Sequence, residues 1–338
     1  MRAWVFEEFG GPLELREVAD PGCPADGVVV RVEATGLCRS DWHAWSGHDD
    51  GVALPHVPGH ELAGVVVEVG AQVRRHRVGD RVTTPFVLAC GACEPCARGE
   101  GQVCAAQEQP GFTRWGSYAE LVALPRADVN LVPLPAELGF TEAALLGCRV
   151  ATAHRAVVAV GGVRAGEQVV VHGCGGVGLS AVAVAVGRGA QVLAVDPAPA
   201  SRALAERLGA RTALPGEVPP AAADLSLDTF GSRATVTASL ACLRPRGRHV
   251  QVGLLGGEDA GTGADLGQVV ARELQVLGSH GMAAADYPGL LAEVAAGTLD
   301  VAGLVRAQVP LVDAGPLLTA LGEPGAGAGG MTVVLPQT

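Results

Sequence analysis

The sequence predicts an α/β protein in which a β-rich module is joined to a doubly wound parallel sheet. In residues 1 to about 147, short β-like runs alternate with glycine and proline turns, which is typical of a β-rich module. From residue 168, strand-like and helix-like segments alternate, and this rhythm predicts βαβ units with right-handed crossovers. The length of 338 residues also exceeds the ~250–300 residues at which single cores stop growing, so two domains are expected.

Five strand-like runs are expected in the β-rich module, because each is apolar and bounded by turn formers. These runs are Met1–Phe6, Gly27–Glu33, Leu62–Val69, Arg81–Thr84 and Tyr118–Val122. Near the other end of the chain, a helix over Tyr287–Ala296 and a strand over Met331–Leu335 are expected to return to this module. Residues 1–147 and 284–338 would then form one domain, and residues 148–283 the other.

The second module is expected to alternate strands with helices on a parallel sheet. Its strands are predicted at Gln168–Val171, Gln191–Val195, Asp224–Asp228 and His249–Val252. Its helices are predicted at Val177–Arg188, Ser201–Leu208 and Ala234–Leu243. No internal repeat accompanies this alternation, so we expect no repeat architecture.

Composition limits the classes of partner. The formal net charge of −11 and the lack of a basic run argue against nucleic acid and anionic membranes, and favour a small-molecule ligand. No leader-like segment precedes the first strand, and the longest apolar stretch, Val169–Val186, is interrupted by four glycines. We therefore expect a cytoplasmic protein without a membrane span. In that compartment the nine cysteines are better explained by metal ligation than by disulfides.

Lysine is absent from the sequence, so all 24 Lys or Arg cations are arginines. Chemistry that needs a lysine amine is therefore excluded: a Schiff base, a phosphate-loop lysine or the Tyr and Lys pair of short-chain reductases. An acid, a metal or a cysteine must carry the chemistry instead.

Four cysteines, Cys90, Cys93, Cys96 and Cys104, lie within fifteen residues. This spacing allows all four sulfurs to surround one tetrahedral metal, and thiolates alone select zinc or an iron-sulfur centre. The intervening residues are mostly turn formers, so the loop has no core of its own and needs a metal to hold it. We predict a zinc site here, the alternative being a reduced cluster without a metal.

A nucleotide site is predicted where Gly173, Gly175 and Gly178 form Gly-x-Gly-x-x-Gly between a strand and a helix. The glycines permit a tight turn, the approach of a pyrophosphate and close helix packing, and the helix N-terminus attracts the phosphates. Asp196 follows the next strand, where its carboxylate could bind the adenosine ribose and repel a 2′-phosphate, so NAD is predicted over NADP. The alternative is an ordinary glycine-rich turn followed by a surface aspartate.

A second metal site is suggested by Cys38, by His60 with Glu61, and by Cys148. Each residue alone is more often a core or surface side chain than a ligand. Together, two thiolates and one imidazole would leave the fourth tetrahedral position open, which is the arrangement of a catalytic zinc.

The chain resembles the zinc-dependent medium-chain alcohol dehydrogenases, essentially from end to end. The motifs that match are the four-cysteine loop, Cys-Arg-Ser-Asp-x-His at 38–43, Gly-His-Glu at 59–61, and the glycine-rich turn with its downstream aspartate. The resemblance implies a GroES-like catalytic domain over residues 1–147 and 284–338, and a Rossmann NAD-binding domain over 148–283.

The resemblance also implies two zinc ions per chain, one catalytic and one structural. It places the catalytic ion on Cys38, His60 and Cys148, with Glu61 an occasional or nearby ligand. It places the structural ion on Cys90, Cys93, Cys96 and Cys104.

Four residues near Cys38 have implied roles in catalysis. Zinc acts as a Lewis acid on the alcohol, which gives its hydride to the nicotinamide. Ser40 resembles the hydroxyl that carries the proton away, and His43 the imidazole that passes it to solvent. Asp41 resembles the carboxylate that orients the zinc-bound imidazole, and Arg39 is expected on the pyrophosphate. For Ser40 and His43 the alternatives are a capping hydroxyl and a solvated side chain.

The remaining implied positions line the coenzyme and substrate. Cofactor contacts are expected at Gly173, Gly175, Gly176, Val177, Gly178, Thr152, Asp196, Arg202, Val252, Leu254 and Ser279. Substrate contacts are expected at Ser40, Trp45, Trp115 and Leu254. For Trp45 a plain packing role is an equal alternative. Members commonly carry an arginine near the C-terminus that touches the cofactor phosphates, but Gly327–Met331 contains none.

The sequence therefore predicts an NAD- and zinc-dependent dehydrogenase acting on a primary or secondary alcohol, or on the matching aldehyde or ketone. The resemblance implies a homodimer or homotetramer. One alternative is a polyol or amino-alcohol dehydrogenase of the same family, which would need polar or charged pocket groups. Another is a catalytically idle NAD-binding regulatory protein, which the loss of catalytic zinc ligands would indicate.

Overall fold

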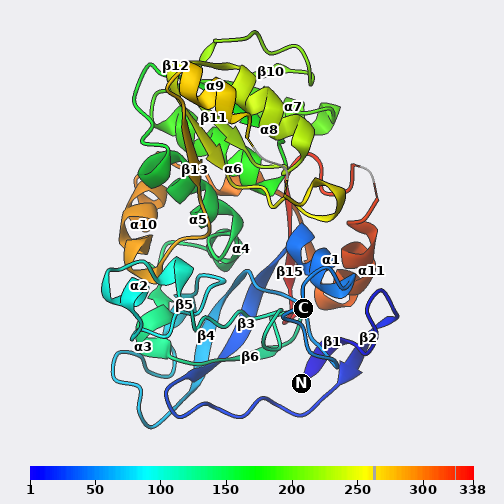
Figure 1. The fold of residues 1–338 in the computed structure, drawn as a ribbon. Coiled ribbons are helices and arrows are strands. Elements are labelled where there is room, and N and C mark those ends of the chain that lie inside the picture. The colour runs from blue at the N-terminus through cyan, green and yellow to red at the C-terminus, as the bar shows by residue number, and fades with distance from the viewer. Residues whose placement is uncertain (262–263, 324) are drawn as a thin grey trace.

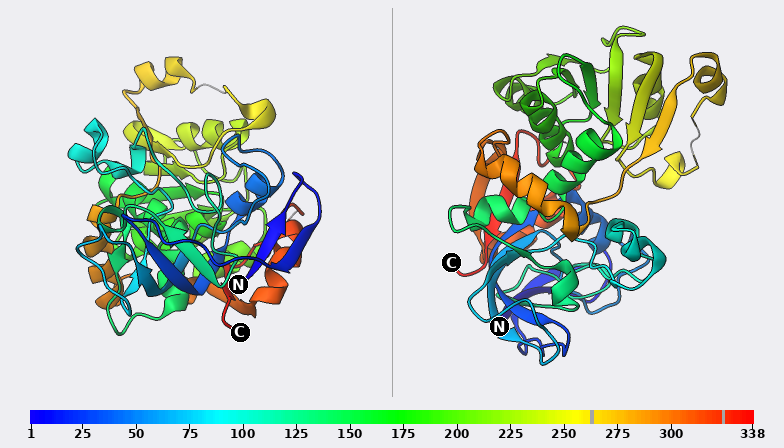
Figure 2. Two further views of the ribbon diagram at one scale, coloured as in Figure 1. Left: turned by 90° about the horizontal axis from the view of Figure 1, so that it is seen from below. Right: turned by 90° about the vertical axis from the view of Figure 1, so that its left-hand side faces the viewer.

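Two large β-sheets dominate the computed structural model, which describes residues 1–261, 264–323 and 325–338. Figure 1 shows the first sheet in the lower half of the molecule, near both termini, and the second sheet in the upper half. The right-hand view of Figure 2 shows the same division from a further side. This arrangement of two sheets confirms the predicted fold class, in which a GroES-like module is joined to a Rossmann module.

The first sheet is mostly antiparallel, with the order β14-β15-β3-β4-β5-β7 and β6 paired to β3. Its strands are β3 (Val28–Leu37), β4 (Leu62–Val69), β5 (Arg81–Thr83), β6 (Leu121–Leu124), β7 (Val132–Pro133), β14 (Val305–Pro310) and β15 (Met331–Leu335). A separate hairpin joins β1 (Arg2–Phe6) to β2 (Leu13–Glu17). Because β15 pairs antiparallel with β3, the C-terminal strand returns to this sheet, as predicted.

The second sheet is entirely parallel, with the order β10-β9-β8-β11-β12-β13. Its strands are β8 (Gln168–His172), β9 (Gln191–Val195), β10 (Arg211–Ala213), β11 (Ala223–Asp228), β12 (Leu243–Gln251) and β13 (Gln275–Gly278). The strand order reverses at β8, whose neighbours β9 and β11 lie on opposite sides. In such sheets the ligand crevice lies beyond the carboxyl ends of the strands at the reversal, and the glycine-rich turn follows β8 directly.

Helices cover the parallel sheet and connect the two modules. Those of the parallel sheet are α6 (Gly176–Gly187), α7 (Pro199–Arg207), α8 (Arg233–Ala241) and α9 (Leu266–Ala271). The others are α1 (Arg39–Trp45), α2 (Glu94–Ala97), α3 (Ala127–Asn130), α4 (Phe140–Leu145), α5 (Arg149–His154), α10 (Tyr287–Ala295) and α11 (Ala314–Ala320). The core cluster that includes α4, α5 and α6 also reaches residues of both sheets, so apolar packing is continuous between the modules.

Three predicted segments differ from the structure at their ends, and one of them, the strand predicted at His249–Val252, begins already at Leu243 in β12. The backbone of Tyr118 hydrogen-bonds to Pro58 and Trp4, so the strand predicted at Tyr118–Val122 begins only at Leu121. The predicted helix Ala234–Leu243 ends at Ala241, because Leu243 already pairs with Ala223 at the start of β12. The sequence did not predict the short helices α1, α4 and α5, or the strands β10, β13 and β14, since their apolar runs are too short to show a clear period.

No helix within the described ranges is long and apolar enough to cross a bilayer.

A buried polar network lies inside the parallel sheet. His172 ends β8 and is 3% exposed, with its Nε2 3.8 Å from the Cys242 sulfur. Nearby, Ser239 bonds both Ser226 and His249 at 2.7 Å. Burial lowers the pKa of His172 from 6.5 to about 4, so the folded protein keeps this imidazole neutral where an unfolded chain would protonate it.

We predict that His172 makes the protein sensitive to mild acid. At pH 7.5 neither the folded nor the unfolded state protonates this imidazole. As the pH falls below 6.5, the imidazole binds a proton in the unfolded state but not in the folded state. The free energy of unfolding therefore decreases by about 2 kcal/mol by pH 5 because of His172. Urea unfolding of the zinc-loaded protein from pH 7.5 to 5 should therefore show a shallower decline for His172→Gln than for the wild type. Parallel declines would contradict the prediction.

Candidate metal centres and coenzyme site

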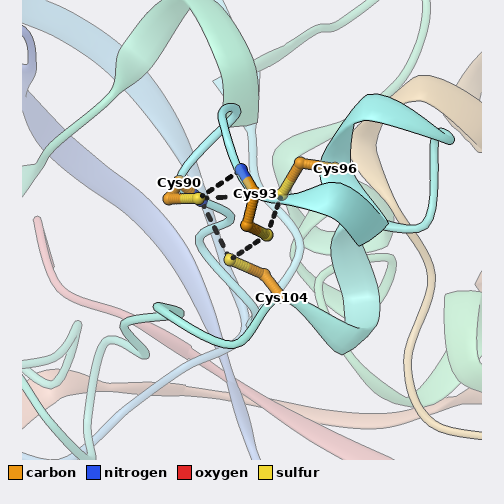
Figure 3. Close-up of side chains that lie close together, drawn as sticks. All are labelled: Cys90, Cys93, Cys96 and Cys104. Atoms are coloured by element: carbon orange, nitrogen blue, oxygen red, sulfur yellow. Dashed lines mark hydrogen bonds between the residues drawn. The ribbon is translucent and has the colours of Figure 1, made fainter.

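The four cysteines of the loop converge on a common point, as Figure 3 shows. Their sulfurs lie within 4.8 Å of one another. The Sγ–Sγ distances are 3.9 Å for Cys90–Cys96, 3.4 Å for Cys93–Cys96 and 3.6 Å for Cys93–Cys104. A tetrahedral zinc with Zn–S bonds of about 2.3 Å separates its sulfurs by about 3.8 Å. The cluster therefore fits a closed four-thiolate zinc site.

Backbone N–H groups hold this loop in a form suited to thiolates. The N–H groups of Ala92 and Cys93 donate to the Cys90 sulfur at 3.4 and 3.3 Å, and these two bonds are the main reason that the pKa of Cys90 is lowered to about 6. The side chain of Asn130 fixes the start of the loop by bonding both the N–H and the carbonyl of Ala89 at 2.7 and 3.0 Å. The lowered pKa of Cys90 favours the anionic form that binds metal, whereas burial raises the pKa of Cys96 to about 12.

A second group brings together Cys38, His60, Glu61 and Cys148, with one ligand atom of each within 4.8 Å of the others. Cys38 lies between β3 and α1, the pair His60 and Glu61 precedes β4, and Cys148 precedes α5. The four residues that the sequence proposes for the catalytic zinc are thus neighbours in the structure, although up to 110 residues separate them along the chain.

Asp41 sets the orientation of His60. Its fully buried carboxylate lies 2.7 Å from His60 Nδ1, and because a carboxylate only accepts, Nδ1 carries the proton. The other ring nitrogen, Nε2, then has a free lone pair, and it is buried without a hydrogen-bond partner among the described residues. A buried polar atom without a partner is rare in proteins, so this nitrogen fits a metal ligand.

The turn before His60 requires glycine. Gly59 has φ +107°, and a Cβ there would lie 2.7 Å from the Tyr118 backbone nitrogen. Its N–H donates to Asp41 at 3.0 Å. A glycine at position 59 therefore allows the backbone to pass close to Tyr118, which places the next residue, His60, beside Asp41.

Glu61 is paired with Arg149. The Arg149 backbone N–H donates to Oε1 at 3.0 Å, and its side-chain Nε lies 2.8 and 2.9 Å from Oε1 and Oε2. Burial raises the pKa of Glu61, although Arg149 opposes that effect. In this arrangement Glu61 is an ion-pair partner of Arg149 near the metal group, and the nearest uncommitted donors are Cys38, His60 and Cys148.

Of the two proposed proton-relay residues, Ser40 lies beside Cys38, whereas His43 contacts His48. The Ser40 hydroxyl is 3.7 Å from the Cys38 sulfur. His43 is exposed, and its Nδ1 is 3.0 Å from Nδ1 of His48. Burial lowers the pKa of His43, and the charges of His48 and Arg39 lower it further, so the imidazole is neutral at pH 7 and able to accept a proton.

The glycine-rich turn has the geometry that close backbone approach requires. Gly173 has φ +87°, and a Cβ on Gly178 would lie 1.8 Å from the Gly173 carbonyl oxygen. A Cβ on Gly175 would meet nothing within 4 Å, which leaves space where a pyrophosphate is expected. Asp196, at the end of β9, accepts the N–H groups of Cys174 and Ala198 at 2.6 and 2.8 Å.

The other predicted coenzyme residues differ in burial and in hydrogen bonding. Thr152 is buried and its hydroxyl has no partner among the described residues, while Arg202 Nη1 donates to the carbonyls of Asp196 and Pro197. Leu254 is 84% exposed, and the Ser279 hydroxyl lies 3.5 Å from Arg155. Val177 and Val252 pack on the central core.

Arg39, Trp45 and Trp115, which the sequence assigns to coenzyme or substrate, contact other residues of the protein in this structure. Arg39 lies over the Trp42 ring at 5.5 Å. Trp45 packs against a core cluster around α11 and donates to the Gly11 carbonyl at 3.0 Å, which agrees with its packing alternative. Trp115 is 39% exposed and donates to Pro55. Their roles toward coenzyme or substrate stay predictions.

The sequence gives no role to three residues that contact this site. Tyr118 donates to Asp41 at 3.0 Å, Arg149 pairs with Glu61, and His48 meets His43. No sequence signal distinguishes Tyr118 or His48 from other surface or core residues. An arginine inside the apolar run at 144–151 is a signal for Arg149, because a buried cation requires a counter-charge.

Comparisons with known proteins agree with this geometry. Residues 24–136 match the alcohol dehydrogenase GroES-like domain, and residues 176–296 match the zinc-binding dehydrogenase domain. An alcohol dehydrogenase of Geobacillus stearothermophilus is 38% identical over 245 residues, which is 71% of each chain. The alcohol dehydrogenase of Thermus sp. ATN1 has a TM-score of 0.90 and 30% identity, with 99% of both chains covered.

One further solved structure bears on the coenzyme. A protein of Sinorhizobium meliloti 1021, described as a zinc-binding dehydrogenase, was solved bound to NADP. It has a TM-score of 0.87 and 28% identity to this chain, and 99% of both chains is covered.

We predict that metal analysis of the purified protein finds about two zinc ions per chain, one for each group. Cys96→Ser should lower the content to about one and reduce the melting temperature, because the loop loses the metal that holds it. Cys23→Ser is the control, since Cys23 lies outside both groups; it should keep both ions. One zinc ion in the wild type would contradict the two-site prediction.

Proposed function

The chain belongs to the zinc alcohol dehydrogenase family of medium-chain dehydrogenases/reductases, and on this premise we propose that it oxidises a primary or secondary alcohol with NAD, or reduces the matching carbonyl. The observation that carries the proposal is the buried Nε2 of His60, which has no hydrogen-bond partner in the described part of the chain and lies beside the sulfurs of Cys38 and Cys148. With Glu61 paired to Arg149, Cys38, His60 and Cys148 would hold a zinc ion, and three protein donors are the set typical of a zinc that also binds substrate.

The residues of the chain prepare this site for alcohol chemistry. Zinc supplies a Lewis acid that makes an alcohol more acidic, and NAD supplies the hydride acceptor. Asp41 holds His60 in the tautomer that ligates through Nε2. We assign Ser40 to receive the substrate proton and His43 to pass it to water, because His43 is exposed and neutral at pH 7.

NAD is favoured over NADP by the surroundings of Asp196. Its carboxylate is fixed by two backbone N–H groups beside the glycine-rich turn, where it would repel a 2′-phosphate. The nearby Arg202 guanidinium is turned toward the carbonyls of Asp196 and Pro197. These contacts support NAD for this chain, although one solved relative carries NADP.

Each of the two sheets belongs to one proposed domain. We assign residues 1–147 and 284–338 to a catalytic domain and residues 148–283 to a coenzyme domain, and the pairing of β15 with β3 supports the return of the C-terminal segment. A homodimer or homotetramer in the cytoplasm is proposed from the family. The idle regulatory alternative is disfavoured because all three catalytic donors are in place.

We predict that Cys38→Ser abolishes turnover of alcohols at pH 8 while NADH still binds. The substitution removes a thiolate donor of the zinc, whereas the glycine-rich turn is in the other module. Turnover is followed by NADH absorbance across primary, secondary, aromatic and polyol alcohols, and binding by NADH fluorescence. Cys23→Ser should retain wild-type turnover. Full activity of Cys38→Ser would refute the zinc mechanism.

We predict that NADH binds at least about tenfold more tightly than NADPH, since a buried charge repels the extra phosphate and a charge-assisted hydrogen bond to the ribose is lost. Parallel fluorescence titrations with the two coenzymes measure this ratio. Asp196→Asn keeps an oxygen acceptor for the N–H groups but removes the charge, so the preference should shrink. Tighter binding of NADPH to the wild type would reverse the assignment.

A further inference from the structure

Arg149 is the buried cation of the site and belongs to no motif. It follows the ligand Cys148 directly and is only 6% exposed. A guanidinium is not deprotonated in proteins, and the Glu61 carboxylate supplies its counter-charge. The guanidinium is therefore a permanent positive charge inside the protein.

One side of Arg149 is committed to Glu61. Nε and Nη2 both donate to the carboxylate, which is a bidentate ion pair. The pair lies against β3 at Gly36, where a Cβ would meet Oε2 of Glu61 at 2.0 Å and Nη2 of Arg149 at 2.7 Å. Gly36 thus leaves the space that the pair occupies.

The other side of Arg149 faces the glycine-rich turn. A Cβ on Gly176 would lie 2.4 Å from the Cδ of Arg149, 3.2 Å from its Nη1 and 3.3 Å from its Nε, so the arginine lies directly against this glycine. Gly176 is the first residue of the twelve-residue helix α6, whose N-terminus attracts anions. Among the described residues, Nη1 makes no hydrogen bond, so this edge of the guanidinium is available beside the helix N-terminus.

We propose that Arg149 is a positioning residue that holds Glu61 with one edge of its guanidinium and binds the coenzyme pyrophosphate with the other. The inference rests on the proposed binding of a dinucleotide at this turn. It gives the phosphates a cation from α5 in addition to the N–H groups of α6. It also gives the Glu61 carboxylate a role apart from metal ligation, because its charge would hold the arginine that the coenzyme uses.

The test separates phosphate binding from folding. Arg149→Met alone would leave the Glu61 charge buried without a partner, so the double variant Arg149→Met/Glu61→Gln is compared with Glu61→Gln, whose amide oxygen can still accept from Arg149, and with the wild type; the melting temperature of Glu61→Gln shows whether it tolerates the buried cation. Calorimetric titration of the zinc-loaded proteins uses ADP-ribose, which carries the pyrophosphate, and adenosine, which does not. Melting temperatures and zinc contents are measured for each variant. Arg164→Met removes an exposed arginine far from both sites and serves as the charge control.

The expected result is a loss confined to the phosphates. Relative to Glu61→Gln, the double variant should bind ADP-ribose about 10- to 100-fold more weakly, the usual worth of a charge-assisted hydrogen bond. Binding of adenosine should not change, and Arg164→Met should match the wild type. Equal ADP-ribose affinity in the two variants, or an equal loss for adenosine, would overturn the inference. If the wild type binds neither NADH nor ADP-ribose, the proposed function fails as well, so the two failures are distinguishable.

Discussion

The metal group depends on one buried carboxylate, that of Asp41. It accepts from His60 Nδ1 at 2.7 Å, from the Gly59 N–H at 3.0 Å and from the Tyr118 hydroxyl at 3.0 Å. The Cys38 N–H completes the set at 3.3 Å. A buried carboxylate is stable only when several donors satisfy it, and these donors come from the junction between β3 and α1, from the turn before β4 and from the segment before β6. Satisfying Asp41 therefore fixes both a thiol ligand and the imidazole ligand.

A second buried charge pair joins the two modules. Glu61 precedes β4 of the first sheet, whereas Arg149 begins α5 and touches the first turn of α6. Breaking such a pair from one side costs about 3–5 kcal/mol, because the remaining charge is left without compensation. The metal group and the glycine-rich turn are thus held in a fixed relation by electrostatics as well as by the continuous core.

The sequence predicts the parts of this site that are encoded by local spacing. The cysteine loop and the glycine-rich turn are short segments, and both have the expected geometry in the structure. The convergence of Cys38, His60 and Cys148 needed the family resemblance, because nothing in their spacing requires them to meet. The partners of Glu61 and Asp41 could not be predicted, since a hydrogen bond between distant residues leaves no periodic pattern. For Trp45 the sequence leaves packing and substrate contact as equal alternatives, and the structure shows its contact with a packed cluster, while a role toward substrate stays a prediction.

The chain contains no lysine, and the chemistry of the two cations explains why arginine suits position 149. Burial lowers the pKa of a lysine amine by several units in many sites, so a lysine here could lose its charge, and its single ammonium cannot bond both oxygens of Glu61 and a phosphate in one plane. The guanidinium stays charged and spreads its donors over two edges, of which Glu61 uses one. Gly36 and Gly176 leave space for the planar guanidinium, because a side chain at either position would displace it. A lysine at this position would satisfy Glu61 only at the expense of the edge that faces α6.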